Sequence, residues 1–503
     1  MKYLFYFYSC FNPTMFGELL DEAVKLSKDP SNNVFFATCD GVNKMCMSNK
    51  MGSKPICDIC KFSTKKTIDD HKINFISLKE YSQINNTFSF SYSNSDELRE
   101  IKYREVSIGL SILSSYMSLT RNMSPKIDKE SKVFFDQHLI QNINFIDALY
   151  NLIEDIKPDK VYSYNGRYEE VRPIYDICKY LRINFTFLEV VKRNGKWYKT
   201  GFENSLPHDI NENIKKREYC WNNYKLSEEQ KISLGKSFFD KRRNGEFSGD
   251  RKIYVANQKE GYIPEFKPNK INIAIMNSSE DEFAAIGEEW DNLKLFKTQL
   301  EGIVYLLDNA EDSIHFYLRI HPNLKNVHYK YHLKLEELEY KYNNITIIPA
   351  SSEMSTYTLM EKVDKVISFG STMGLESVYW GKPSILVGPS LYYFDDVSFV
   401  PSSKIDLIKL LSQNLKANRE NIKILKMGAY ILNQDPLIID LERQFKYVDF
   451  NVERHRILGK ELSVAPFINF IVNKTITGFI LAFLRGVFDN KYFRKYKLPT
   501  VEE

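Results

Sequence analysis

Apolar residues in the first part of the chain alternate between short runs and a longer segment with helical spacing. Residues 2–9 (KYLFYFYS) and 33–38 (NVFFAT) are apolar runs of strand length, so they predict two strands. Between them, residues 16–27 place apolar side chains near helical spacing, which predicts a helix. The order strand, helix, strand predicts a parallel βαβ unit that brings Cys10 and residues 39–41 (Cys-Asp-Gly) to one edge of the sheet.

The same alternation continues along the chain in two series. Residues 138–156 predict a long helix, and residues 160–189 predict a strand, a loop at Asn165-Gly166-Arg167, a helix and another strand. Residues 195–265 are polar and irregular, which is typical of a linker or an insertion. Five further strands are expected after it, at residues 271–276, 315–319, 345–348, 365–369 and 384–387. Two α/β series of this kind predict two Rossmann-like lobes facing a cleft, with ligands bound beyond the strand ends.

The predicted boundaries divide this α/β chain into four parts. They are an N-terminal lobe (1–210), a linker or insertion (211–265), a C-terminal lobe (266–445) and C-terminal helices (446–503). Residues 465–488 are apolar and precede four basic residues, Lys491, Arg494, Lys495 and Lys497. Such a segment fits a helix that crosses back onto the N-terminal lobe, or one that contacts an anionic membrane surface.

Composition excludes some classes of partner. The chain has 503 residues, of which 43% are hydrophobic and 27% charged, as in an ordinary globular protein. Its net charge of +4 comes from 69 basic and 65 acidic residues, a balance that argues against nucleic acid as the main partner. The N-terminal apolar run is too short for a signal peptide, and no run reaches the roughly 20 apolar residues of a membrane span. We therefore expect a cytoplasmic protein, with peripheral contact at the inner face of the plasma membrane as an open alternative.

The strongest chemical signal is the segment DKVISFGSTMGLESVYWGKPSILVG (364–388). A buried strand leads into Gly370-Ser371-Thr372, where glycine permits a tight turn and the two hydroxyls cap the next helix. The N–H groups at the start of that helix favour an anion. Glu376 follows Thr372 by one helical turn, so we expect it to accept hydrogen bonds from ribose hydroxyls. The alternative is a capped helix with a surface glutamate.

Two other predicted strand ends carry polar residues. Arg319 and His321 lie two positions apart on an extended backbone and point to the same side, where both can donate to phosphate oxygens. His321 is also a candidate acid that protonates a leaving phosphate. In the loop after residues 271–276, Ser278 and Ser279 are candidates for binding phosphate or base, and Glu282 for orienting a sugar. A structural histidine and an acidic helix cap are the alternatives.

Four of the seven cysteines lie close together, as Cys39-x6-Cys46-x10-Cys57-x2-Cys60. The closing C-x2-C is a usual half-site for zinc, and four thiolates suit a structural tetrahedral site. Reduced thiols, a cluster or a disulfide are the alternatives. A zinc ion here would hold together the loop after the second strand and would fix the neighbouring Asp40.

Several of these segments resemble one known family. They are NSSEDEF (277–283), LRIHPN (318–323), SSEMSTYTLM (351–360), FGSTMGLESVYWGKP (369–383), TCDGVNKMC (38–46), CDIC (57–60) and YNGRYEEVRPIYD (164–176). The chain resembles the capsule-polysaccharide-biosynthesis family of bacterial glycosyltransferases, which contains the Kdo transferases. The resemblance implies a GT-B fold, a nucleotide-sugar donor on the C-terminal lobe and an acceptor on the N-terminal lobe. It also implies chemistry without a catalytic metal.

The resemblance also implies roles for individual residues. The donor-binding positions carried over from the family are Arg319, His321, Ser371, Thr372 and Glu376, with Ser355 and Tyr357 lining the same pocket.

An inverting transfer further requires a base in the N-terminal lobe, for which Asp40 and Glu189 are the candidates because both follow predicted strands. A retaining transfer would need no such base. Asn165 and Arg167 are expected at the acceptor, Arg167 because its charge suits an anionic one.

The function expected from the sequence is transfer of a sugar from a nucleotide sugar to a surface polysaccharide or a glycolipid of the capsule or lipopolysaccharide type in the cell envelope. The base of the donor is open, and a CMP-linked donor is among the candidates. A polyol-phosphate transferase with a CDP-linked donor is one alternative. A non-catalytic protein that binds a nucleotide or a sugar is the other.

Overall fold

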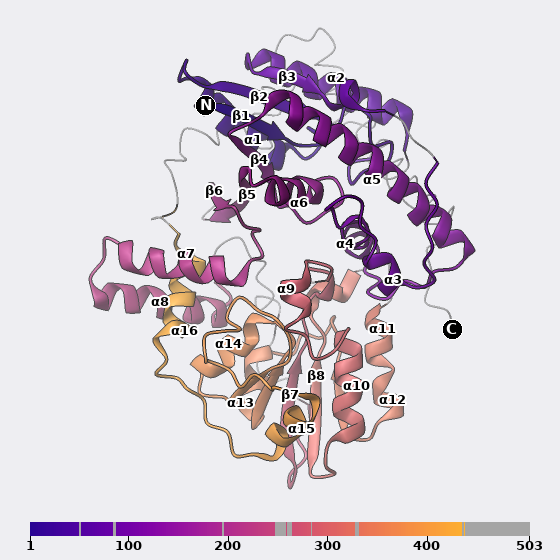
Figure 1. The fold of residues 1–503 in the computed structure, drawn as a ribbon. Helices are drawn as coiled ribbons and strands as arrows, with labels where there is room; N and C mark the ends of the chain where they lie inside the picture. Colours follow the sequence, from indigo (N-terminus) through magenta and orange to yellow (C-terminus); the bar gives the residue numbers. More distant parts are fainter. Residues whose placement is uncertain are drawn as a thin grey trace, which may run out of the picture.

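The computed structural model describes residues 1–434 and 437, apart from residues 50–51, 84–86, 194–195, 247–257, 259–263, 283 and 327–330. The segment 446–503, predicted to form the C-terminal helices, lies outside the described residues. No helix within the described part of the chain is long and apolar enough to cross a membrane. The described chain forms two α/β lobes, one above the other (Figure 1).

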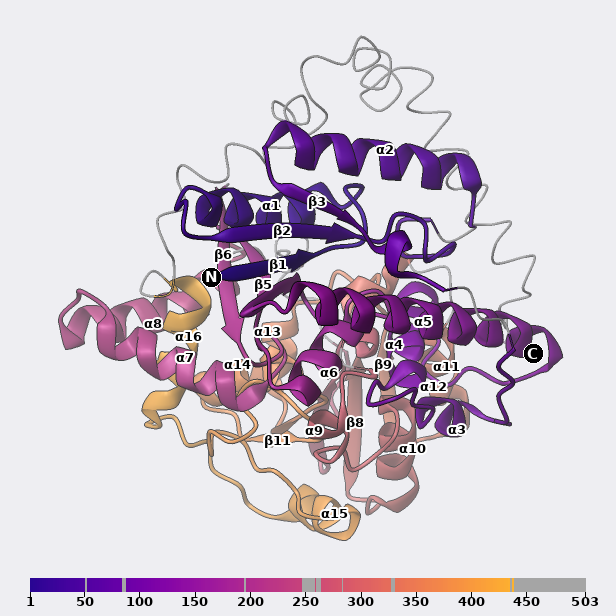
Figure 2. The same ribbon diagram turned by 45° about the horizontal axis from the view of Figure 1, so that its top comes forward.

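The N-terminal lobe is built on a six-stranded sheet in the order β3-β2-β1-β4-β5-β6. The strands are β1 (Lys2–Tyr6), β2 (Asn33–Thr38), β3 (Asn74–Ser77), β4 (Lys160–Tyr164), β5 (Asn184–Arg193) and β6 (Lys196–Glu203). All pairs are parallel except β5 with β6. The helices are α1 (Pro13–Ser27), α2 (Lys54–Asp70), α3 (Ser95–Arg99), α4 (Ile108–Thr120), α5 (Lys129–Ile156) and α6 (Arg172–Leu181). Figure 2 shows α2 on one side of β1, β2 and β3 and α5 on the other.

Aromatic side chains fill much of the core of this lobe. Phe5 on β1 stacks on Tyr162 of β4 with ring centroids 4.6 Å apart, and it also stacks on Phe36 of β2. The strand runs were predicted from such residues, because β-branched and aromatic side chains favour a pleated, buried surface. The long helix α5 begins at a capping box between Asp128 and Ser131, which fixes its start nine residues before the predicted one.

The C-terminal lobe has a parallel five-stranded sheet in the order β11-β10-β7-β8-β9. The strands are β7 (Ile271–Met276), β8 (Ile314–Arg319), β9 (Ile345–Ile348), β10 (Lys365–Ser368) and β11 (Ser384–Leu386). Its helices are α9 (Glu288–Asp291), α10 (Gln299–Asn309), α11 (Tyr331–Glu336), α12 (Leu338–Lys341), α13 (Thr356–Lys362), α14 (Thr372–Tyr379) and α15 (Lys404–Ser412). The chain runs outward from β7 to β9 and then returns to the other side of β7 with β10. This reversal creates a switch point between β7 and β10, the place where open α/β sheets bind ligands.

Three helices beside this lobe come from distant parts of the sequence: α7 (Ile210–Asn223), α8 (Glu228–Arg243) and α16 (Ile422–Leu432). They lie side by side in Figure 1. Gly235 of α8 faces the backbone of α16 so closely that a Cβ there would lie 2.5 Å from the Leu425 carbonyl oxygen. Phe238 and Cys220 share an apolar cluster with Leu375 of α14. Residues 211–243, expected to form part of a linker or an insertion, therefore pack against the C-terminal lobe.

Two elements differ from the prediction. Strand β6 lies at the start of the stretch predicted to be irregular, where it pairs with β5 as an antiparallel hairpin. Helix α2 occupies what was expected to be a loop. Its buried residues are Ser63, Thr64, Thr67 and Ile68, so a single apolar side chain marks its inner face and no helical stripe is visible in the sequence.

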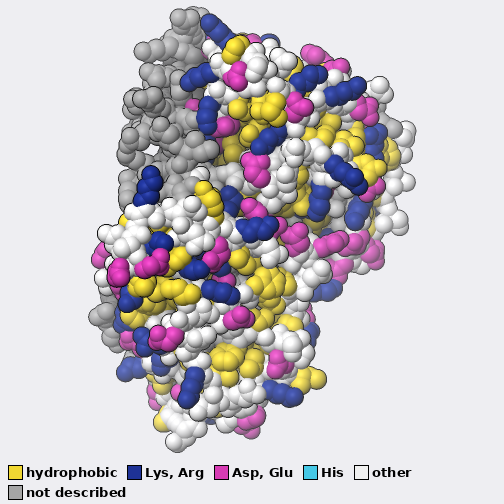
Figure 3. Space-filling model, turned by 60° about the vertical axis from the view of Figure 1, so that its left-hand side comes forward, with side chains coloured by type: hydrophobic (Ala, Val, Ile, Leu, Met, Phe, Trp, Pro, Cys, Tyr) yellow, Lys and Arg dark blue, Asp and Glu magenta, His cyan; other side chains and the backbone are white. Residues whose placement is uncertain are grey.

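Charged side chains of both signs are interspersed over the face of the molecule in Figure 3. On that face there is no broad surface of one sign, which agrees with the balanced composition.

Candidate active site

A cavity of about 460 Å³, here called the switch-point cavity, lies at the carboxyl ends of β7, β8 and β10. It is lined by Arg242, Gln258, Met276, Asn277, Ser278, Ser279, Glu282, Arg319, His321, Pro322, Asn323, Thr356, Tyr357, Gly370, Ser371, Thr372 and Met373. Of the predicted donor-binding residues, only Ser355 and Glu376 do not line it. Residues from five separate regions of the chain thus meet where the topology predicts a ligand.

The turn after β10 presents the start of a helix to this cavity. Gly370 has φ = +78°, and a Cβ there would lie 2.8 Å from the Pro389 carbonyl oxygen, so the position requires glycine. The Ser371 carbonyl accepts hydrogen bonds from the hydroxyls of Ser368 at 2.9 Å and Tyr392 at 2.6 Å. The Ser371 hydroxyl caps α14 by accepting the Met373 N–H at 3.3 Å. The first turn of α14 is therefore held in place at a site that favours an anion.

Three buried N–H donors belong to residues that line the cavity. Asn277 is 2% exposed, and its Oδ1 accepts the backbone N–H of His321 at 2.8 Å. Within the described part of the chain, no acceptor pairs with Nδ2 of Asn277, Nε of Arg319 or Nε of Arg242. Buried donors without acceptors are costly. A bound anion would supply acceptors to donors of this kind.

The ring of His321 is neutral at physiological pH. Burial, with the nearby Arg319 and Arg242, lowers the pKa of His321 to about 4. Its Nδ1 accepts the Asn323 N–H at 3.2 Å, so the proton of the neutral ring is on Nε2. His321 therefore acts here as a hydrogen-bond donor and does not carry the extra proton that the predicted acid role requires.

Arg319 supports the floor of the cavity. Its guanidinium donates to the carbonyl oxygens of Pro349 at 2.6 Å and Ser352 at 3.0 Å. Desolvation lowers its pKa to about 10, which still leaves it charged at neutral pH. The positive charge that was predicted to bind a phosphate is therefore present. Two of the guanidinium N–H groups, however, donate to the loop that precedes α13.

Glu376 contradicts its predicted contact with ribose. The side chain is fully buried, with Oε1 3.1 Å from Nη2 of Arg242, while Oε2 accepts the hydroxyl of Tyr357. This face of α14 packs against α8, so the carboxylate is directed away from the cavity. Glu376 instead holds two of the residues that line it.

Ser355 also differs from its prediction. Its hydroxyl accepts the Thr358 N–H at 3.2 Å and so caps α13, while the neighbouring Thr356 and Tyr357 line the cavity. Because the Ser355 hydroxyl caps the helix, it is directed along the helix axis. The first residues of α13, and not Ser355, therefore face the cavity.

Arg242 is, with Gln258, a cavity residue that the sequence did not reveal. It lies at the end of α8, in the segment expected to be a linker or an insertion, 134 positions from Glu376. The carboxylate of Glu376 raises the pKa of Arg242. The only local signal is the basic last turn of α8, Lys241-Arg242-Arg243, and such a turn is ordinary at the carboxyl end of a helix.

The two base candidates lie apart on the edge of the N-terminal sheet. Glu189 is on β5, where its carboxylate accepts the side-chain N–H of Asn165 at 2.7 Å. Desolvation raises the pKa of Glu189 to about 7. Asp40 follows β2 and accepts the hydroxyl of Ser77. Strands β1 and β4 separate β2 from β5, and neither carboxylate lines the switch-point cavity.

Arg167 connects the two lobes, which contradicts its predicted exposure to an acceptor. The side chain is 4% exposed and donates to the Ser114 hydroxyl at 2.8 Å and to the Glu282 carbonyl at 2.6 Å. It also donates to the carbonyl of Asp281, whose carboxylate pairs with Arg121. The guanidinium thus binds the loop after β7 of the other lobe.

The four clustered cysteines line one small cavity of about 20 Å³, together with Asp40. Cys57 and Cys60 lie on α2, so the predicted metal site would join a helix to the loop after β2. Nevertheless, no three His, Cys, Asp or Glu side chains of the described residues are arranged to hold a metal ion. Zinc at these cysteines remains a prediction.

Two Rossmann-like lobes, with the loop after β4 bonded to the loop after β7, agree with the architecture that the family resemblance predicted. The chain has a GT-B-like fold. No family model matches it, and no curated protein matches it by sequence.

Solved structures include proteins of similar fold. The beta Kdo 2,4 transferase of Thermosulfurimonas dismutans KpsC is 11% identical over 60% of this chain and 87% of that chain, with a TM-score of 0.33. UDP-GlcNAc 2-epimerase from Neisseria meningitidis is 13% identical over 86% and 95%, with a TM-score of 0.24. The glycosyltransferase SsfS6 of Streptomyces sp. SF2575 is 9% identical over 86% and 95%, with a TM-score of 0.19. At these identities and TM-scores the likeness does not extend to function.

Proposed function

We propose that this protein is a glycosyltransferase that takes its sugar from a nucleotide-sugar donor bound in the switch-point cavity. The observation that carries the proposal is the set of N–H donors around that cavity: Asn277, Arg319, Arg242 and the start of α14. N–H donors gathered on the residues around one cavity suit the phosphates of a nucleotide. A volume of about 460 Å³ is in the range of small-molecule sites.

In the proposed reaction, an acceptor hydroxyl attacks the anomeric carbon of the donor sugar as the bond from that carbon to the phosphate oxygen breaks. The leaving phosphate gains negative charge, which the N–H donors of the cavity and the Nε2–H of His321 stabilise. Such preorganised donors stabilise the transition state more than the ground state, because the charge develops during the reaction.

Glu189 is the base that we propose for the acceptor hydroxyl, in an inverting transfer. Support comes from its pKa of about 7, which makes the carboxylate available near neutral pH and still basic enough to take a proton. Its position on β5 of the N-terminal lobe, one residue beyond the pairing of β5 with β4 and held by Asn165, agrees with an acceptor on that lobe.

The acceptor that we propose is a surface polysaccharide or a glycolipid of the capsule or lipopolysaccharide type. The family resemblance supports this class of acceptor, and peripheral membrane contact through residues 446–503 would bring the enzyme to it. The class of acceptor and the membrane contact do not depend on what binds in the donor cavity.

Incubation with labelled UDP-, GDP-, CMP-, CDP- and dTDP-linked donors tests the proposed function. We expect slow hydrolysis of one sugar donor without acceptor, reduced at least about tenfold in His321→Ala. Turnover of a CDP-linked polyol alone would favour the polyol-phosphate transferase. Binding of a nucleotide with no turnover on a wide panel of acceptors would favour a non-catalytic protein, and binding of none would contradict the proposal.

Zinc at Cys39, Cys46, Cys57 and Cys60 is a structural proposal that does not depend on this chemistry. Mass spectrometry of protein purified without chelators should give one zinc ion per chain. A matched Cys57→Ser, Cys60→Ser variant should give none, whereas Cys178→Ser, at a buried cysteine outside this cluster, should retain it. Zero zinc in the unaltered protein would contradict the proposal.

A further inference from the structure

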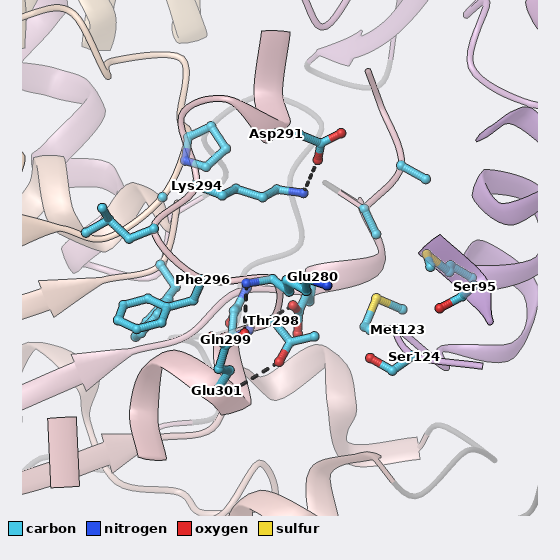
Figure 4. Close-up of a pocket in the computed structure, with 18 of the residues that line it drawn as sticks. Ser95, Met123, Ser124, Glu280, Asp291, Lys294, Phe296, Thr298, Gln299 and Glu301 are labelled. Carbon is cyan, nitrogen blue, oxygen red and sulfur yellow. Dashed lines mark hydrogen bonds and ion pairs between the residues drawn. The ribbon is translucent and has the colours of Figure 1, made fainter. Parts of the chain in front are cut away.

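A second cavity, here called the interlobe cavity, has a volume of about 510 Å³ and is lined by both lobes. The N-terminal lobe contributes Leu113 and Met117 from α4 and Met123 after it. The C-terminal lobe contributes Phe296, with Phe369 and Val387 from the ends of β10 and β11. Figure 4 shows Met123 and Ser124 on one side of this cavity, opposite Lys294 and Phe296. None of the predicted site residues lines it.

The interlobe cavity adjoins the switch-point cavity through two short stretches of chain. Ser279 lines the switch-point cavity, and the next residue, Glu280, lines the interlobe cavity. Likewise, Gly370 lines the switch-point cavity, and the preceding residue, Phe369, lines the interlobe cavity. Between the two cavities, Gln299 donates to the Ser278 hydroxyl at 2.7 Å, and that hydroxyl donates to the Phe369 carbonyl at 2.9 Å. Two ligands, one bound in each cavity, would therefore be separated from each other by one layer of side chain and backbone.

The charges around the interlobe cavity neutralise one another. Four lining residues are basic (Arg99, Lys294, Lys297 and Lys404) and four are acidic (Asp96, Glu280, Asp291 and Glu301). Asp291 pairs with Arg99 and, at 2.8 Å, with Lys294. Lys297 pairs with Asp96, and Lys404 with Glu301 at 3.2 Å. Every basic residue that lines the cavity thus has a carboxylate partner, which differs from the unpaired N–H donors of the switch-point cavity.

We propose that the interlobe cavity binds the acceptor of the transfer through one uncharged sugar ring, other than the ring whose hydroxyl reacts, because Glu189 does not line this cavity. A sugar ring has an apolar C–H face, which suits the floor of Leu113, Met117 and Phe296, and a rim of hydroxyls, which suits paired charges that both donate and accept. A phosphate or carboxylate would meet as many acidic as basic groups, so it gains no net attraction. A purely apolar ligand would displace the water that hydrates these ion pairs without replacing its hydrogen bonds. This assignment rests on the proposed function, because it presumes a donor in the neighbouring cavity.

Blocking the cavity from its solvent-exposed side gives the first test. Ser124 is exposed and lines the cavity, so Ser124→Trp would fill part of it; Ser91→Trp, at an exposed serine of the same lobe outside the cavity, is the matched control. Binding of uncharged methyl glycosides (hexoses, deoxyhexoses and N-acetylhexosamines) is measured by saturation-transfer NMR. We expect at least one to bind the unaltered protein and Ser91→Trp, and to bind Ser124→Trp at least about tenfold more weakly.

Changing the charge balance gives the second test. Asp291→Asn removes the carboxylate shared by Arg99 and Lys294, so the cavity gains net positive charge. The probes are a methyl hexoside and the matching methyl hexuronide, which differ by one carboxylate. The unaltered protein should prefer the uncharged probe, and Asp291→Asn should shift the preference towards the hexuronide by about tenfold.

Three results would overturn the assignment: no binding of any uncharged glycoside, equal binding in Ser124→Trp, or tighter binding of the hexuronide by the unaltered protein. Calorimetric titration of the same samples with nucleotides separates this assignment from the proposed function. Loss of glycoside binding with nucleotide binding intact refutes the acceptor site alone. Absence of nucleotide binding refutes the proposed function, whatever the glycosides do. Thermal melting of each variant shows whether it folds.

Discussion

The strand-end edges of the two sheets differ in how they use the residues predicted for them. At the edge of the C-terminal sheet, the predicted loops after β7, β8 and β10 meet in one cavity. At the edge of the N-terminal sheet, the predicted residues have three separate environments. Glu189 contacts Asn165, Asp40 lies beside the cysteines, and Arg167 binds the other lobe.

The difference follows from how each edge is encoded. The segment around Gly370 specifies its own geometry, because a strand, a glycine turn and a capped helix are local features. The N-terminal residues depend on partners far away in the chain, such as the loop at residues 281–282 that Arg167 binds. The sequence therefore predicts the arrangement of residues at the edge of the C-terminal sheet better than at the edge of the N-terminal sheet.

The largest expected effect tests the N-terminal edge. Glu189→Gln should lower the rate of transfer by about 10²–10⁴-fold, because a general base is lost. The pKa of Glu189 is raised to about 7, so below that pH the carboxyl is protonated and the rate should fall about tenfold for each pH unit. Above it the carboxylate is present and the rate should level off. Initial rates of transfer, measured from pH 5 to 9 for the unaltered protein and for Glu189→Gln, give the loss of rate and the apparent pKa.

Asp40→Asn is the control for this comparison, since Asp40 is the other predicted base. We expect it to change the rate less than about tenfold and to leave the pH profile intact. A larger loss in Asp40→Asn than in Glu189→Gln would move the base to the end of β2. A rate that does not change with pH would show that the transfer does not depend on a base with a pKa near 7.

The next effect tests the C-terminal edge. Gly370→Ala combines a strained φ of +78° with a contact to the Pro389 carbonyl, so it should lower the free energy of unfolding by about 3 kcal/mol. Gly381→Ala is the matched control, because its φ of +89° is similarly unfavourable but the nearest atom to the added Cβ, on the Arg419 side chain, is 3.5 Å away. Its loss should be about 1 kcal/mol. Urea unfolding measures both, and equal losses would show that the turn tolerates a side chain.

The smallest effect concerns the cap of α14. Ser371→Ala should cost about 1 kcal/mol of stability and also weaken nucleotide binding, because the first turn of α14 faces the cavity. Ser403→Ala removes the cap of α15, which does not line the switch-point cavity, and should cost the same stability with no effect on nucleotide binding. Equal nucleotide affinity in both variants would show that the start of α14 does not bind the nucleotide.

Much of the fold was predictable from periodicity. The strands 33–38, 160–164, 271–276 and 345–348 have their predicted limits, because their buried apolar runs end at polar or turn residues. Helix α2 was missed because its inner face is largely hydroxyl-bearing. Strand β6 was missed because it is a polar edge strand stabilised by pairing with β5.

The candidate site was predictable only where its residues follow their own strands. The loops holding Ser278, His321 and Ser371 were found because each follows a strand of the same sheet. Arg242 could not be found, since only the packing of α8 on α14 brings it to the cavity. The same packing buries Glu376, so the side chain expected to contact ribose instead holds Arg242.

Nucleotide binding by a matched pair of arginine variants tests the central claim most directly. The double variant Arg242→Met, Glu376→Gln removes the cavity cation without leaving a buried, unpaired carboxylate. Arg243→Met changes the neighbouring arginine, which pairs with Glu361 and does not line the cavity. Calorimetric titration with uridine, guanosine, cytidine and thymidine nucleotides should show one that binds the unaltered protein and Arg243→Met equally, and the double variant at least about tenfold more weakly. Equal affinity in all three proteins, or no binding to any of them, would contradict a nucleotide donor in the switch-point cavity.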